Sequence, residues 1–292
     1  MKQLLILLLS AVLLVSCGTE KTGTEDTTPE TQPAAEKTEA ETEESEVTKT
    51  IGITALGDSI TRGYGLADVS GDRFTTVLHD LLKKDGVTAK VANYGVDGIT
   101  SGGLLDELEA GYYTAVKAAD TVTLCIGANN ILGAGFDFFE AYAADPEGDL
   151  TDDYALMRKR ADAGIADLEE DLPKILENIR ELNPDCRIVL LNLYNPYAHI
   201  DISLDAIEEG MTIASLTDEY IRKMNAVTQS YLEDDMGFVD VYAAFEGHSA
   251  AYVCAYSEDG KLTNVDPHPT ADGHEAIGEA LYNAEFIMQK EE

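Results

Sequence analysis

Short, continuously apolar runs alternate with helix-period stripes over residues 50–292, and this alternation constrains the fold more than any other feature. The runs are typical of buried strands and the stripes of amphipathic helices. Alternating strands and helices imply crossovers and a parallel sheet, and strands apolar on both sides imply helices on both faces. We therefore predict one α/β domain, a three-layer α/β/α structure with a doubly wound sheet of about five parallel strands. Strands are expected at residues 51–56, 87–92, 121–126, 187–193 and 238–241, and helices at 74–82, 103–110, 165–182, 221–231 and 271–289.

Local signals mark some helix ends. Pro173 is expected to kink the longest helix or to begin its second half, because proline lacks the N–H that continues a helix. Residues 183–185, Asn-Pro-Asp, should end that helix. Thr270 is placed to cap the last one.

The N-terminus carries an export signal. Residues 4–15 form an apolar run after Lys2, and the run is shorter than the roughly 20 residues that span a bilayer. The sequence Leu-Val-Ser-Cys at 14–17 resembles the lipobox of bacterial lipoproteins. That resemblance implies a signal peptide over residues 1–16, cleavage before Cys17, and a lipid on Cys17 that anchors the protein to the outer face of the bacterial cell membrane. An ordinary signal peptide with an incidental cysteine is the alternative.

The next segment and the overall charge limit the partners. Residues 17–49 are rich in Thr, Glu, Ala and Pro, which predicts a disordered acidic tether, and residues 50–292 then form the folded domain. The net charge is −35, and the tether holds only a minority of it. An acidic domain argues against binding to nucleic acid and against attraction to anionic lipid head groups. The basic cluster at residues 158–160 is interpreted as a solvated helix face.

The remaining cysteines indicate neither a disulfide framework nor a metal site. Cys125, Cys186 and Cys254 show no CxxC and no metal-ligand spacing. Cys125 is expected at the end of one strand and Cys186 at the start of the next, which are opposite ends of parallel neighbours. We interpret all three as buried thiols.

Polar motifs follow the predicted strands. Gly-Asp-Ser at 57–59 follows the first strand, an Asn-to-Thr loop at 93–100 the second, and Gly-Ala-Asn-Asn at 127–130 the third. Asp-Pro-His-Pro at 266–269 precedes the last helix. Ligands of doubly wound sheets bind beyond the carboxyl ends of the strands, so these motifs are expected to converge on one rim.

These residue types fit acyl transfer by a serine. A serine hydroxyl needs a base, and the base needs an orienting acceptor; Ser59, His268 and Asp266 are the candidates. The tetrahedral intermediate also needs donors aimed at its oxyanion, and the Ser59 N–H, the Gly98 N–H and the Asn129 side-chain amide could supply them. This chemistry needs neither a metal nor a cofactor.

Gly-Asp-Ser, a glycine after the second strand, Gly-x-Asn after the third and a late Asp/His pair resemble the SGNH, or GDSL-type, hydrolase family. The resemblance covers residues 50–292. It implies a flavodoxin-like fold, hydrolysis of esters, and Ser59, Gly98, Asn129 and His268 as the four named residues, with Asp266 completing the triad.

Two positions depart from the family pattern. The asparagine of the third motif is usually followed by Asp, and here Asn130 follows it; Asn130 can still form local hydrogen bonds. The acid usually lies three residues before the histidine, but Val265 occupies that position. Asp266 must therefore reach His268 across one proline, and Asn264 is the weaker alternative.

Other polar residues near the motifs are given structural roles. Asp58 is expected to bond nearby backbone, and Asn93 to tie loops together. His274 lies in the last helix as a packed or surface residue. Gly95 is kept as an alternative to Gly98 for the oxyanion donor.

Two long connections leave the carboxyl ends of strands and carry aromatic residues, at 131–163 and 194–216. They form either a pocket wall or lid, or a small extra helix packed on the core. A wall or lid would make part of the substrate site apolar.

Three functions remain open from the sequence. The leading one is an extracytoplasmic serine esterase that forms an acyl-enzyme on Ser59 and acts on a lysophospholipid, a lipid ester or a short acyl ester. The second is a carbohydrate acetyl esterase with the same residues. The third is a surface lipoprotein that binds a ligand without cleaving it, suggested only by the Asp266–His268 spacing. A flavin-binding protein of this fold would leave Ser59 and His268 without a role.

Overall fold

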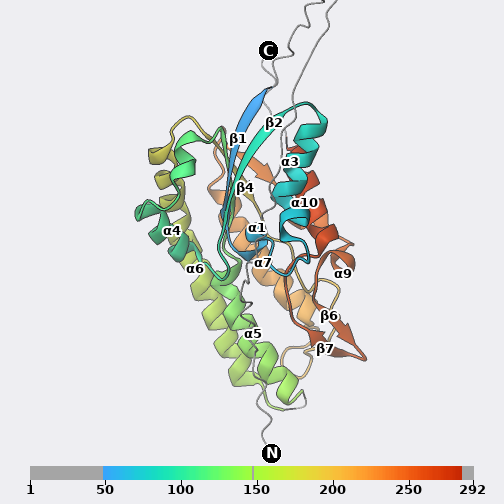
Figure 1. The fold of residues 1–292 in the computed structure, drawn as a ribbon. Coiled ribbons are helices and arrows are strands. Elements are labelled where there is room, and N and C mark those ends of the chain that lie inside the picture. Colours follow the sequence, from blue (N-terminus) through green and yellow to red (C-terminus); the bar gives the residue numbers. More distant parts are fainter. Residues whose placement is uncertain (1–48, 147, 285–292) are drawn as a thin grey trace, which may run out of the picture. The chain divides into compact units, whose positions relative to one another are not determined.

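A computed structural model describes residues 49–146 and 148–284 (Figure 1). The predictions for residues 1–16, Cys17 and 17–48 lie outside the described residues, as does the part of the last predicted helix after residue 284. Within the described ranges, no helix is long and apolar enough to cross a membrane. The elements are β1 (Thr50–Gly57), α1 (Ser59–Arg62), α2 (Val69–Asp72), α3 (Phe74–Lys84), β2 (Thr88–Gly95), α4 (Ser101–Glu109), η1 (Thr114–Ala118), β3 (Thr121–Cys125), α5 (Ala128–Ala144), α6 (Thr151–Leu182), β4 (Arg187–Leu191), α7 (Ile213–Ser230), β5 (Gly237–Val239), α8 (Val241–Phe245), α9 (Ser249–Tyr252), β6 (Tyr256–Glu258), β7 (Lys261–Asn264) and α10 (Ala271–Asn283).

The central sheet has the order β2-β1-β3-β4-β5, and every neighbouring pair is parallel. This is the flavodoxin-like order, so the predicted α/β class and sheet are confirmed. In the register, Gly57 pairs with both Gly95 and Cys125, so β1, β2 and β3 end at the same level. The strand order reverses between β1 and β3, and this is where ligands of such sheets bind.

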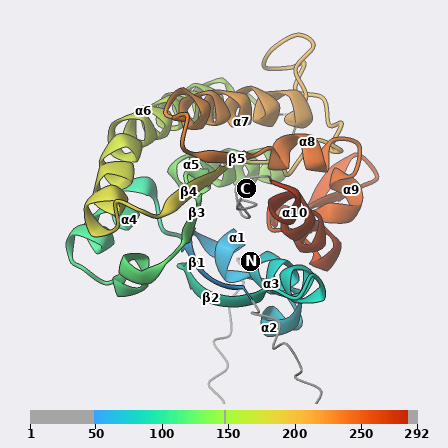
Figure 2. The same cartoon turned by 90° about the horizontal axis from the view of Figure 1, so that it is seen from above.

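Helices cover both faces of the sheet. Figure 2 shows α4, α6 and α7 on one face and α3 and α10 on the other. The strands are buried, as expected for a sheet covered on both sides: β3 is buried along its whole length, its two threonines included, and β4 at all but its first residue. The three-layer prediction is therefore correct.

Element boundaries differ from the predictions in places. β2 continues to Gly95, three residues beyond the predicted end, and β4 stops at Leu191. The helix expected at 221–231 begins at Ile213, where Thr212 and Ser215 form a capping box. Thr270 caps α10 as predicted, because its side chain accepts the Gly273 N–H.

The longest helix, α6, continues through its proline. Pro173 lies inside α6, so it does not start a separate helix. A proline cannot donate to the carbonyl four residues earlier, which here belongs to Glu169. The Tyr231 hydroxyl donates to that Glu169 oxygen at 3.0 Å. A hydroxyl from the segment after α7 thus supplies the hydrogen bond that the proline removes.

Residues 131–163 are mostly helical. They contain most of α5 and the first part of α6, and these two helices pack along each other. The expectation of a long connection with a small extra helix was wrong for this segment. The antiparallel β6–β7 hairpin, which has no counterpart in the predictions, projects from the molecule in Figure 1.

Thiols and basic residues need two corrections. Cys125 and Cys186 are free and buried as predicted, but Cys254 is only partly buried. Arg158 is not merely a solvated cation, since it donates to both carboxylate oxygens of Glu219 at 2.9 Å each. This bidentate pair joins α6 to α7.

Candidate active site

Ser59 stands at the junction of β1 and α1. Asp58 caps α1 through its side chain, which accepts the Ile60 N–H at 2.9 Å, so its predicted structural role is correct. Gly57 has a φ of 157°, and a Cβ there would lie 2.3 Å from the Cys125 carbonyl oxygen. Only glycine allows so close an approach, and the turn that begins there places Ser59 directly beyond the sheet.

The structure brings the three predicted residues into one chain of contacts. The Ser59 Oγ lies 2.8 Å from His268 Nε2, and His268 Nδ1 lies 2.5 Å from Asp266 Oδ1. With its proton on Nδ1, the ring donates to Asp266 and can accept the Ser59 proton at Nε2. A two-residue spacing is therefore long enough, because Asp266 Oδ1 also accepts the His268 N–H at 3.1 Å and folds the segment back on itself.

Asn264 does not contact His268 in this arrangement. Its Oδ1 accepts the Asp266 N–H at 3.1 Å, and its Nδ2 donates to the Cys254 carbonyl at 2.9 Å. Asn264 thus orients the loop that carries Asp266, and the structure favours Asp266 over Asn264 as the acceptor for the imidazole.

Three tyrosines contact the loop that carries His268, residues 265–269, which we call the histidine loop. The Tyr194 hydroxyl donates to the Pro267 carbonyl and the Tyr197 hydroxyl to the Val265 carbonyl, each at 2.6 Å. The Tyr64 ring lies against the His268 ring, with 4.6 Å between the ring centres. No role was expected for Tyr64, which lies five residues after Ser59. Tyr194 and Tyr197 were recognised only as pocket-wall candidates.

The candidate oxyanion donors differ in whether their N–H groups already have a hydrogen-bond partner. The Gly95 N–H is already bonded to Asn93 Oδ1 at 3.0 Å, and a Cβ at Gly95 would lie 2.1 Å from the Arg62 nitrogen. The Gly98 N–H and the Ser59 N–H have no hydrogen-bond partner among the described residues. Gly98 has a φ of 75°, a conformation that favours glycine. Gly95 therefore acts in packing, and Gly98 is the better donor candidate.

Asn129 lies next to the Gly98 loop. Its Nδ2 donates one hydrogen to the Ile99 carbonyl at 3.0 Å, which leaves the second hydrogen for a ligand. Asn130 accepts the Ser101 N–H at 3.0 Å and donates to Ser101 Oγ at 2.7 Å, so it forms the predicted local bonds.

The loop-tying role expected of Asn93 is also present. Its Nδ2 donates to the Thr61 carbonyl at 2.6 Å and to Thr75 Oγ1 at 3.0 Å. These bonds connect the end of β2 to α1 and α3. The loops that carry Ser59 and Gly98 are thereby fixed relative to each other.

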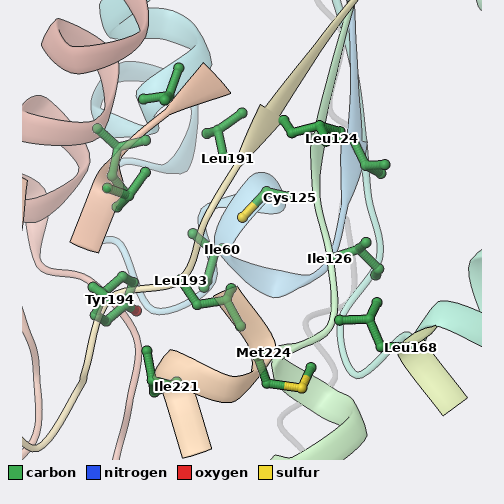
Figure 3. Packing of buried hydrophobic residues seen from close by; sticks show 14 of the residues in the cluster. Ile60, Leu124, Cys125, Ile126, Leu168, Leu191, Leu193, Tyr194, Ile221 and Met224 are labelled. Carbon is green, nitrogen blue, oxygen red and sulfur yellow. The ribbon is translucent and has the colours of Figure 1, made fainter. Parts of the chain in front are cut away.

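A deep apolar pocket opens beside Ser59. The space within it that water-sized molecules can occupy is about 100 Å³, and Ser59, Asn129 and His268 lie in its wall. The rest of the wall comes from Ile60, Pro267, the segment after β4, and α5, α6 and α7. Figure 3 shows three of these residues, Ile60, Leu193 and Ile221, among the buried apolar side chains that pack together. Both segments predicted as wall or lid do line the pocket. The α5 and α6 wall residues are Ala128, Asn129, Ile131, Leu132, Gly135, Phe136, Phe138, Phe139, Met157 and Ala161.

The pKa values of three groups around the site are shifted by burial and hydrogen bonding. Burial raises the pKa of Asp58 to about 6, although the Ile60 N–H partly opposes this. Partial burial also opposes ionisation of Asp266, but the hydrogen bonds from His268 prevail and lower its pKa. Burial lowers the pKa of His274 to about 4, which keeps this fully buried ring neutral where it accepts the Phe74 N–H. The packed alternative for His274 is therefore correct.

Among the described residues, no group of three or more His, Cys, Asp or Glu side chains is arranged to hold a metal ion. The candidate site is thus built from the side chains and backbone donors given above.

Comparisons with known proteins identify the family. The family model of the GDSL-like Lipase/Acylhydrolase family matches residues 55–276. The chain is 25% identical to the uncharacterized protein YpmR of Bacillus subtilis, over 82% of this chain and 84% of that protein. It is also 25% identical to the spore germination lipase LipC of Bacillus licheniformis, over 81% of this chain and 97% of that protein.

A solved structure shows the same fold. The lipase Lip_vut3 from a goat rumen metagenome superposes with a TM-score of 0.57 at 24% identity, over 79% of this chain and 95% of that one. The family model covers both the Ser59 and the His268 motifs and most of the domain. The chain therefore belongs to the GDSL-like lipase/acylhydrolase family and is an ester-hydrolysing enzyme.

Proposed function

We propose that the protein is an extracytoplasmic serine hydrolase that cleaves esters of apolar acyl chains, such as lysophospholipids or other lipid esters, through an acyl-enzyme on Ser59. One observation carries the proposal: Ser59, His268 and Asp266 form a continuous chain of hydrogen-bond contacts at the mouth of an apolar pocket.

The geometry supports a two-step reaction. As Ser59 Oγ attacks the ester carbonyl, its proton moves to His268 Nε2, and Asp266 holds the resulting imidazolium. His268 then gives this proton to the departing alcohol, leaving the acyl group on Ser59. In the second step, water gives a proton to His268 and attacks the acyl carbon. His268 then returns this proton to Ser59 Oγ as the acid is released.

The negative oxygen formed in each step needs donors. The free N–H groups of Ser59 and Gly98 and the second hydrogen of Asn129 Nδ2 are assigned this role. Each such donor is typically worth on the order of 10²–10³ in turnover.

The pocket favours an apolar acyl chain over an acetyl group. An acetyl group would occupy only the part beside Ser59 and would leave the wall from α6 and α7, which includes Met157 and Tyr220, without a ligand. The name of the similar lipase LipC is in line with a lipid ester. The binding-only alternative loses its support, because Asp266 does reach His268.

The proposed location rests on the first 17 residues. We propose export through the segment 1–16 and anchoring through a lipid on Cys17. The test is mass spectrometry of the protein extracted from the membrane fraction of the expressing cells, where the N-terminal peptide is expected to begin at Cys17 and to carry a lipid. An N-terminal peptide that begins elsewhere, or a Cys17 without a lipid, would contradict the anchor.

The activity test uses p-nitrophenyl esters of increasing acyl length. The wild-type protein should hydrolyse them, with a preference for chains longer than acetyl, and Ser59→Ala should abolish the reaction. Ser230→Ala, which changes an exposed serine at the end of α7, is the matched control and should retain full activity. Equal rates for wild type and Ser59→Ala would refute the proposal.

A further inference from the structure

Exposed apolar side chains gather around the loop of residues 265–269, which contributes Pro267 and His268 to the pocket wall. The described residues expose seven large apolar side chains. Four of them lie close to the loop that carries His268, through the contacts given in the next paragraph. They are Tyr64, Val69, Tyr256 and Val265, exposed by 49%, 38%, 44% and 37%; we refer to them as the apolar rim.

Specific contacts connect the rim to the site. Tyr64 lies against the His268 ring, and Val265 directly precedes Asp266. Tyr256 pairs with Asn264 in the β6–β7 hairpin. Val69 packs beside Gly63, next to Tyr64, at 3.5 Å from the position of a Cβ there.

The opposite end of the sheet provides a comparison. Of the other three, Tyr112 precedes β3 and Leu232 precedes β5, so both lie near the amino ends of the strands, and Leu156 lies in α6. Single exposed apolar residues of this kind are normal on soluble proteins. Four around the loop that carries His268 are not explained by that background.

We propose that the apolar rim docks the pocket mouth onto an uncharged or zwitterionic lipid surface, so that ester lipids enter the pocket directly from it. This inference rests on the proposed function, because esters whose chains fill an apolar pocket are held in aggregates rather than dissolved in water. Contact of the rim with such an aggregate buries apolar side chains on both sides of the contact.

Charge selects the kind of surface. The segments 62–73 and 256–266, which carry the rim, contain five carboxylates and three cations, and the whole chain has a net charge of −35. Anionic head groups would be repelled within a Debye length, about 10 Å at 0.1 M salt. Zwitterionic surfaces impose no such cost.

The absence of tryptophan from the chain allows a position-specific test. Full-length proteins carrying Ser59→Ala, to prevent hydrolysis, receive one reporter each: Tyr64→Trp, Tyr256→Trp or, as the matched control, Tyr112→Trp. Each is mixed with phosphatidylcholine vesicles whose acyl chains are brominated, and the loss of tryptophan emission is measured. Thermal unfolding of each variant verifies that it folds, and Val69→Trp replaces a rim reporter that does not.

The rim reporters are expected to lose emission and shift to shorter wavelength, while the Tyr112→Trp reporter stays unchanged. Because each tryptophan reports its own surroundings, attachment through the N-terminal segment alone would not give this pattern. Silence at all positions, equal quenching at all positions, or quenching that appears only with phosphatidylglycerol vesicles would each overturn the proposal.

A parallel assay separates this inference from the proposed function. Protein with an intact Ser59 is given the soluble ester p-nitrophenyl butyrate. Hydrolysis together with silent rim reporters would refute the docking surface and leave the esterase standing. Failure to hydrolyse any p-nitrophenyl ester would refute the esterase whatever the vesicles show.

Discussion

At the scale of single residues, the spacing of Asp266 and His268 was the least predictable part of the site. Sequence identifies the carboxylate and the imidazole, but it cannot show whether two residues of separation suffice. The answer depends on the backbone turn, in which one Asp266 oxygen accepts both the ring and the backbone N–H of His268. Tyr64 was missed for a related reason, since only the folded chain brings its ring to His268.

Removing the charge of Asp266 tests its role. Asp266→Asn is expected to lower kcat by on the order of 10²–10⁴, because the imidazole loses the acceptor that fixes its tautomer and stabilises its cation. KM should change little, since Asp266 does not line the pocket. Asp272→Asn, at an exposed position in α10, is the control. Steady-state kinetics on one p-nitrophenyl ester distinguishes the cases, and unchanged kcat for Asp266→Asn would contradict the assignment.

Asp58 gives a pH prediction that is separate from catalysis. Burial raises its pKa from 3.8 to about 6, and its Oδ2 has no partner among the described residues. The unfolded chain loses this proton near pH 4 and the folded chain near pH 6, so the free energy of unfolding falls as pH rises through that window. Above pH 6, the ionised Asp58 lowers the free energy of unfolding by about 3 kcal/mol relative to pH 4.

The substitution Asp58→Asn should remove that slope. The unfolding free energy of the variant minus that of the wild type is expected to rise by up to about 3 kcal/mol between pH 4 and pH 7. A constant cost of the new amide cancels in this comparison. Urea unfolding at the two pH values measures it, and a difference independent of pH would show that the carboxyl is not held protonated by burial.

At the scale of elements, strands and amphipathic helices were predictable, whereas α5 and the first part of α6 were not. The stretch 131–163 has no clean apolar stripe, because α5 presents residues to the pocket as well as to α6. Gly133 and Gly135 also weaken the helical signal. Packing between the two helices overrides the local preference.

The passage of α6 through Pro173 is an element-scale prediction. Tyr231→Phe should lower the free energy of unfolding by about 1 kcal/mol, because the Glu169 carbonyl loses the hydrogen bond that replaces the one from the missing proline N–H. In a Pro173→Ala background the backbone can supply that bond, so the same change should cost clearly less. A double-mutant cycle of urea unfolding measures the difference. Equal costs in both backgrounds would mean that the hydroxyl does not compensate for the proline.

Helix α6 should also set the acyl length that the pocket admits. Ala161 is buried in the wall, and Ala161→Leu would fill space that a chain would occupy. We expect turnover of dodecanoyl esters to fall on the order of tenfold relative to butanoyl esters. Ala163→Leu, on the exposed face of the same helix, is the matched control and should leave the ratio unchanged. A ratio unaffected by Ala161→Leu would place the chain elsewhere.

At the scale of the whole molecule, the order of elements fixes where the site forms. Four motifs separated by up to about 200 residues meet because each follows a strand or precedes the last helix, which the alternation in the sequence already indicated. The shape of the pocket and the gathering of exposed apolar residues around the loop that carries His268 were not predictable. Both depend on how α5, α6, α7 and the β6–β7 hairpin are placed around the sheet, and no local pattern encodes that.

The central claim is that His268 and Asp266 activate Ser59. The most direct test is to treat the full-length protein with a fluorophosphonate and to locate the adduct by peptide mass spectrometry. A single adduct on Ser59 is expected, with labelling much slower in His268→Ala and in Asp266→Asn. An adduct on another serine, no adduct, or equal labelling rates in the His268→Ala variant would contradict the account.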